Sequence, residues 1–292
     1  LILVLIGIFI IRASNLAKYV IRCPKHNNRF VHVINGRAKG SSIESRSAAR
    51  NKKSTLRSKG IYLLPNLFTT GALFFGFYAI VASMNGDFEK AAIAIFVSMI
   101  LDGLDGRVAR LTNTQSEFGA EYDSLSDMVS FGVAPALIAF SWSLQSLGQV
   151  GWIASFIYVA GAALRLARFN TQIDTADKNY FTGLASPAAA AIVAGTLWAL
   201  SEYGVSGPDV ALLMSVVVAT AGLLMVSNVQ YHSFKGIDLK GKVPFVAMLA
   251  IVGGFAVVSL DPPTILLGIF LIYGSSGPLM TAWKWFKNRK SA

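Results

Sequence analysis

The sequence predicts an all-α integral membrane protein with about eight transmembrane helices, on the strength of three observations. Of its 292 residues, 54% are hydrophobic and only 14% are charged, whereas ordinary soluble domains carry roughly 25% charged residues. The mean hydropathy is +0.55. From residue 63 onward, apolar stretches near the roughly 20 residues needed to cross a bilayer core recur between short polar breaks. These observations exclude an ordinary soluble globular domain.

Eight apolar segments are expected to cross the membrane. They cover residues 63–84, 90–110, 119–141, 151–169, 185–203, 209–228, 243–260 and 262–283. The breaks between them are rich in Asn, Gly, Asp and Pro, as in Asn85-Gly86-Asp87 and Ser206-Gly207-Pro208-Asp209. Residues of these types form turns. The sequence therefore predicts short connections between consecutive helices.

The charge distribution predicts which side of the membrane each loop faces. Residues 1–60 hold 13 Lys and Arg and one acid, so all of the net charge of +11 lies in the N-terminal tail. The loops beyond the tail alternate between basic and acidic or uncharged, and basic loops are typical of the cytoplasmic side. Both termini are therefore expected in the cytoplasm, and a nucleic-acid partner is not expected. We predict a basic tail at 1–57, disordered or outside the fold, and a membrane domain at 58–290.

Four aspartates near one end of two consecutive segments are the strongest chemical signal. Asp102 and Asp105 are three residues apart, and Asp123 and Asp127 are four apart, so each pair shares a helix face. Carboxylates inside a membrane are costly, and two facing pairs repel each other unless cations lie between them. Carboxylate oxygens suit Mg²⁺ or Mn²⁺, particularly beside a substrate diphosphate. A cation-coupled transporter is the alternative from another class, although its acids are expected nearer the midplane.

Small residues accompany the acids and allow two interpretations. Gly106, Ala109 and Gly119 leave room for a ligand to approach the backbone, but small residues also mediate helix packing in membranes. Arg110 suits either a phosphate or the membrane boundary. These residue types alone leave both interpretations open.

The spaced string Asp102-x2-Asp105-Gly106-x2-Ala109-Arg110-x8-Gly119-x3-Asp123-x3-Asp127 resembles the signature of the CDP-alcohol phosphotransferase family. Four segments outside this string resemble the bacterial phosphatidylserine synthase branch of that family. They are 65–69, 164–170, 181–187 and 224–228. The resemblance covers roughly residues 58–290 and departs from the branch at Ala185, where Pro is usual.

The resemblance implies transfer of the phosphatidyl group from CDP-diacylglycerol to the hydroxyl of L-serine, giving phosphatidylserine and CMP without ATP. It implies a two-ion site for Mg²⁺ or Mn²⁺, in which Asp102 and Asp123 bridge both ions and Asp105 completes one site. Asp127 would contact the second ion and act as the general base. Within the family, glycerol 3-phosphate or inositol phosphate is the alternative acceptor.

The resemblance also implies the binding residues. Gly106, Ala109 and Gly119 would border the cytidine and ribose, and Arg110 would help to fix the nucleotide. Asn66 and Thr69 would line the same pocket, although both residue types also join helices by hydrogen bonds. Arg165 and Arg168 are candidates for the serine carboxylate or the lipid phosphate, or they anchor a helix end. A homodimer in the bacterial cytoplasmic membrane, with its active site at the cytoplasmic face, is expected.

Overall fold

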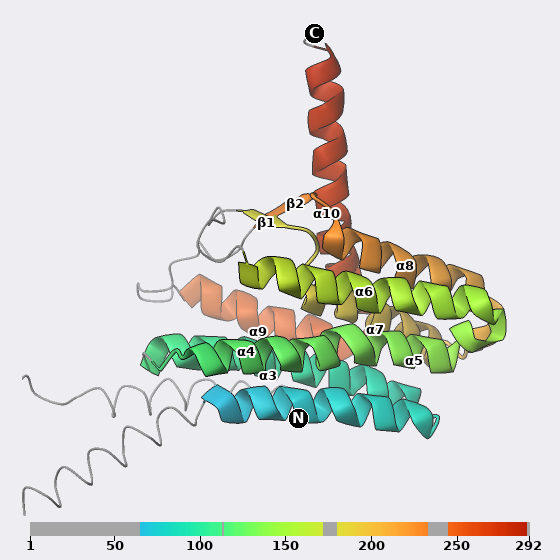
Figure 1. Cartoon of the computed structure of the whole chain (residues 1–292), viewed down its shortest axis with the longest axis horizontal. Helices are drawn as coiled ribbons and strands as arrows, with labels where there is room; N and C mark the ends of the chain where they lie inside the picture. Colours follow the sequence, from blue (N-terminus) through green and yellow to red (C-terminus); the bar gives the residue numbers. More distant parts are fainter. Residues whose placement is uncertain (1–64, 113, 172–179, 233–244, 291–292) are drawn as a thin grey trace, which may run out of the picture.

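The computed structural model describes residues 65–112, 114–171, 180–232 and 245–290, which form a bundle of helices (Figure 1). The all-α prediction is confirmed, and one short pair of strands is added. The helices are Pro65–Met84, α3 Phe88–Thr112, α4 Glu117–Asp127, α5 Ala134–Trp142, α6 Gln149–Thr171, α7 Ser186–Glu202, α8 Ala211–Val226, α9 Phe245–Leu260 and α10 Pro262–Lys290. A π-helical segment, Met128–Val133, joins α4 to α5, and the strands are β1 Tyr180–Thr182 and β2 Gln230–His232.

A helix occupies each of the eight predicted segments. Among the described residues, five helical stretches are long and apolar enough to cross a membrane: Pro65–Met84, Glu117–Trp142, Gln149–Thr171, Gly207–Val226 and Pro262–Trp283. The helices in the other three predicted segments, α3, α7 and α9, do not meet both conditions. α3 carries several charged residues, and α7 and α9 have only 17 and 16 residues. The predicted N-terminal tail lies outside the described residues, as does the boundary at 58.

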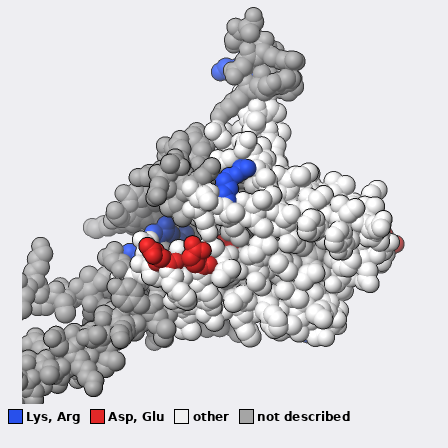
Figure 2. Space-filling view, in the orientation of Figure 1, with Lys and Arg blue, Asp and Glu red and all other residues white. Residues whose placement is uncertain are grey.

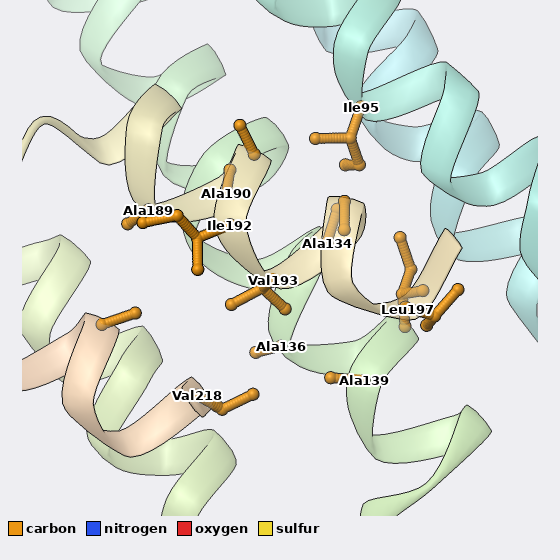
Figure 3. Close-up of a cluster of buried hydrophobic side chains, with 14 of the residues drawn as sticks. Ile95, Ala134, Ala136, Ala139, Ala189, Ala190, Ile192, Val193, Leu197 and Val218 are labelled. Carbon is orange, nitrogen blue, oxygen red and sulfur yellow. The ribbon is translucent and has the colours of Figure 1, made fainter. Parts of the chain in front are cut away.

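The core is centred on α7, whose sequence is dominated by small residues. Ala188–Ala191, Val193 and Ala194 are all buried. Figure 3 shows α7 side chains beside alanines of α5, with Ile95 of α3 and Val218 of α8 completing the cluster. Small side chains let helix backbones approach closely, and van der Waals contact is a main source of helix association in lipid. The sequence of α7 therefore places it inside the bundle.

The contact between α6 and α8 depends on two facing glycines. A Cβ atom at Gly161 would lie 2.4 Å from the carbonyl oxygen of Gly222, and a Cβ at Gly222 would lie 2.7 Å from Cα of Tyr158. Both neighbouring atoms belong to backbone, so a rotamer change cannot relieve the overlap. These two positions consequently fix the distance between α6 and α8.

The π-helical segment after Asp127 is held by its neighbours on two sides. Ser130 Oγ donates to the carbonyl of Ala72 at 3.2 Å, and Gly76 provides the space beside Ser130. On the other side, the buried Tyr158 hydroxyl donates to the carbonyl of Phe131 at 3.0 Å. Such segments are rare and occur frequently at functional sites. The chain following Asp127 is thus tied to both the first helix and α6.

The two strands join the connections that precede α7 and α9. β1 pairs antiparallel with β2, with Phe181 opposite Tyr231. Gly183 follows β1 with φ of +82°, and a side chain there would meet the carbonyl of Met225. Ala185, the departure from the family pattern, has φ of −62°, which is the value that proline adopts. Ala185 therefore keeps the backbone conformation of the family's proline, although it lacks the proline ring.

The outer surface of the bundle is largely uncharged. Exposed apolar side chains include Phe74 and Phe77 of the first helix, Trp152 and Phe156 of α6 and Leu212 of α8. An apolar surface of this extent is expected where a protein contacts lipid. In Figure 2, the visible charged side chains of the described residues gather mainly at the end of the bundle where α4 begins. This end is therefore the one suited to water and headgroups.

We expect Gly161→Ala to destabilise the protein by about 1–3 kcal/mol, the usual cost of overpacking a tight contact. Thermal unfolding in detergent measures the effect. Gly268→Ala in α10 is the matched control, because a Cβ at Gly268 meets no atom within 4 Å. Equal stability of the two variants would contradict the role assigned to the glycine contact.

Candidate active site

Three of the predicted aspartates form one cluster. Asp102 lies on α3 and Asp123 and Asp127 lie on α4. Each offers a carboxylate oxygen, and these three oxygens all lie within 4.8 Å of one another. The four-residue spacing in α4 places its two aspartates on one face. The structure therefore brings residues from both predicted pairs together.

Asp105 occupies a neighbouring position one turn further along α3. Its side chain is buried, and its Oδ2 accepts a hydrogen bond of 2.7 Å from Thr69 Oγ1 on the first helix. Thr69 is also buried. The bond therefore joins two helices, and it satisfies a carboxylate that would be costly to bury alone.

A cavity of about 340 Å³ lies beside the carboxylates. It is lined by Pro65, Asn66, Thr69, Asp105, Gly106, Ala109, Thr114, Gln115, Ser116, Gly119, Ala120 and Asp123. Five of the six predicted nucleotide-binding residues are in this lining. The exception is Arg110, which is exposed and donates from Nε to the carbonyl of Gly106 at 2.9 Å. The structure thus separates Arg110 from the other five.

The beginning of α4 forms part of the cavity wall. Ser116 caps this helix, since its Oγ accepts the backbone N–H of Gly119 at 3.0 Å. A Cβ at Gly119 would lie 3.1 Å from Ser116 Oγ and 3.4 Å from Asn66 Oδ1, so a larger residue would crowd both. Ser116 was not among the predicted site residues, although a serine directly before a helical segment is a recognised capping signal.

The carboxylate cluster fits a divalent cation. Asp123 Oδ1 is buried and has no hydrogen-bond partner among the described residues. A buried carboxylate oxygen is costly when unpaired, and here two further carboxylates lie nearby. The donor set consists of hard oxygens, which Mg²⁺ and Mn²⁺ prefer. The cluster therefore has the charge and the donor type of a metal site.

The two predicted arginines lie in different surroundings. Arg165 of α6 donates from Nη1 to Ser186 Oγ at 2.5 Å and interacts electrostatically with Asp127. Arg168 is one turn further and donates to Asn228 Oδ1 at 3.4 Å. It lines a second cavity, of about 470 Å³, with Thr182, Asn228 and Gln230. Only Arg165 is thus placed against the aspartate cluster.

Comparison with known proteins identifies the family. A family model described as CDP-alcohol phosphatidyltransferase matches residues 62–227. This chain belongs to that family. The matched part of the chain contains all four aspartates and both arginines. Family membership overturns the transporter alternative.

Several relatives carry the name CDP-diacylglycerol–serine O-phosphatidyltransferase. The protein from Helicobacter pylori is 41% identical over 215 residues, which are 73% of this chain and 90% of the relative. The Mycobacterium leprae protein is 34% identical, with 74% of each chain covered. The Methanocaldococcus jannaschii protein is 36% identical over 62% of this chain and 80% of its own.

Replacing Thr69 by Val should destabilise the protein by about 1–3 kcal/mol, because the buried Asp105 carboxylate loses its donor while the side-chain shape is retained. Thr69→Ser keeps the hydroxyl and should remain near wild type. Denaturation of both variants in detergent checks this. Equal stability of the Val and Ser variants would show that the Thr69–Asp105 hydrogen bond does not stabilise the protein.

Proposed function

We propose that this protein transfers the phosphatidyl group of CDP-diacylglycerol to the hydroxyl of L-serine, producing phosphatidylserine and CMP. One observation carries the proposal. The aspartate cluster borders a cavity lined by small residues, in a chain that covers 90% of a serine O-phosphatidyltransferase with 41% identity. The family supplies the reaction type, and the names of the relatives supply the acceptor.

The four aspartates would hold the cofactor. Asp102 and Asp123 would contribute to the sites of both divalent ions, Mg²⁺ or Mn²⁺, with Asp105 in one site and Asp127 in the other. When bound, the ions neutralise the diphosphate and stabilise the negative charge that develops on CMP. The unpartnered Asp123 Oδ1 and the short separation of three carboxylates support this assignment.

The nucleotide end of the substrate would enter the 340 Å³ cavity. Gly106, Ala109 and Gly119 leave its wall open to cytidine and ribose, and Asn66 offers an amide for hydrogen bonding. Thr69 contributes indirectly, since its hydroxyl is bonded to Asp105. Arg110 would fix the nucleotide from outside the cavity, because its exposed side chain is not part of the lining.

Asp127 would accept the proton of the serine hydroxyl as general base. The hydroxyl oxygen then bonds to the phosphorus that carries diacylglycerol, and the bond from that phosphorus to the CMP oxygen breaks. Arg165 interacts electrostatically with Asp127 and would bind the carboxylate of serine, whereas Arg168 lines the second cavity. We assign serine to Arg165, and the lipid phosphate or the incoming serine to Arg168.

The protein is an integral membrane protein, and we place it in the bacterial cytoplasmic membrane as a homodimer. The alternation of basic and acidic loops along the sequence supports an active site at the cytoplasmic face, with both termini on that side. The region 58–290 would form the catalytic membrane domain, and 1–57 a basic tail beside anionic lipid headgroups.

Purified protein with CDP-diacylglycerol and Mn²⁺ or Mg²⁺ should release CMP when L-serine is added. Asp127→Asn should lower this release by at least about 100-fold, because a general base contributes 10²–10⁴-fold. Glu121→Gln, an exposed position on the same helix, should release CMP at the wild-type rate. Release that requires glycerol 3-phosphate or inositol phosphate instead would retain the family and change the acceptor.

Arg165→Ala should raise the KM for serine by about tenfold or more, since a hydrogen bond to a charged group contributes about 1.5–3 kcal/mol. The same substitution at Arg168 tests the second cavity. Steady-state CMP release at varied serine and varied CDP-diacylglycerol separates the two substrates. An unchanged serine KM in both variants would remove the arginines from acceptor binding.

A further inference from the structure

The last helix, α10, is longer than a membrane span requires. Its 29 residues extend about 43 Å at 1.5 Å per residue, against a hydrocarbon core of about 30 Å. The first part packs against α7, where a Cβ at Gly195 would touch Leu267 and a Cβ at Gly274 would lie 2.8 Å from Ile192. The C-terminal part of α10 is therefore not needed to cross the membrane.

A proline and a tyrosine mark where this remaining part begins. Pro278 has no N–H, so the carbonyl of Gly274, four residues earlier, lacks its helical donor. The buried Tyr231 of β2 replaces that donor, with its hydroxyl 3.0 Å from the Gly274 oxygen. Gly277 leaves space for the tyrosine ring, which a Cβ there would approach to 2.5 Å. Burial raises the pKa of Tyr231 to about 12, so its hydroxyl keeps the donated proton.

Beyond this point, α10 leaves the bundle. Figure 1 shows its C-terminal part standing across the direction of the other helices, and hence along the plane of a membrane that the bundle crosses. Leu279 and Trp283 are 66% and 74% exposed. Residues 284–290 contain four cations, two aromatic residues and no acid. The segment thus combines apolar residues, aromatic residues and positive charge.

We propose that residues 279–290 form an interfacial helix that binds the anionic headgroup layer of the membrane. Helices of this composition lie in the interface, where tryptophan is enriched and each Lys or Arg is attracted to anionic lipid. A second copy of the same segment is a poorer partner, because two such segments would bring eight cations together without an acid. In Figure 1 this part of α10 rises beside β1 and β2, the strands in the connections that follow α6 and α8.

Spin labels test the proposal in the full-length protein. With Cys23→Ser as background, one label is placed at Ala282, three residues after Leu279 on the same side, and one at Thr281, on another side of the helix. Both positions are exposed. In vesicles of phosphatidylcholine and phosphatidylglycerol, the label at 282 should become more accessible to oxygen than to a water-soluble nickel chelate, and the label at 281 should not.

The charge dependence decides whether headgroups are the partner. The combined variant Lys284→Gln, Lys287→Gln, Arg289→Gln and Lys290→Gln should lose the burial of the label at 282, as should vesicles of phosphatidylcholine alone. Lys284→Arg with Lys287→Arg should retain it. Equal burial in both lipids, equal water exposure of both labels, or spin coupling between two copies would each overturn the proposal. The neutral variant should still release CMP in detergent, which separates this test from the proposed activity.

Discussion

The mutual repulsion of three aspartates is the constraint on which the rest of the structure depends. Carboxylates within 4.8 Å of one another repel strongly when partly buried, and the bundle must hold them there from separate helices. The Thr69–Asp105 bond ties the first helix to α3, and the bonds from Ser130 and Tyr158 hold the chain after Asp127. A bound cation would convert the repulsion into attraction. The surrounding helices hold the carboxylates in place, and a bound cation would neutralise their negative charge.

The sequence was sufficient for the helices and for the aspartate cluster because both depend on local spacing. Apolar length defined the segments, and intervals of three and four residues placed each acidic pair on a single face. The short connection between the two acidic segments predicted that they form neighbouring helices and share one site. Five of the predicted nucleotide-binding residues line the cavity beside the aspartates. The family string fixes Gly106, Ala109 and Gly119 relative to the aspartates, whereas Asn66 and Thr69 belong to a separate matching segment.

Features that depend on distant parts of the chain could not be predicted in the same way. Arg165 and Arg168 are one helical turn apart, yet one lies by Asp127 and the other by Asn228, because the surrounding helices approach α6 differently at each turn. The π-helical segment has no periodic signature in the apolar run, and its partners Ala72 and Tyr158 are remote in sequence. The pairing of β1 with β2 likewise joins residues about 50 positions apart.

Because α7 is enclosed by other helices, bilayers of different thickness should affect it less than the outer helices. Lipid tails impose a hydrophobic length on the helices that they contact, and mismatch is relieved by tilting or by deforming the bilayer. α7 has only 17 residues, but nearly all of them are covered by other helices. Its length is therefore matched to protein neighbours rather than to lipid. A change in acyl-chain length would act first on the outer helices, while the alanine-rich centre would keep its dimensions.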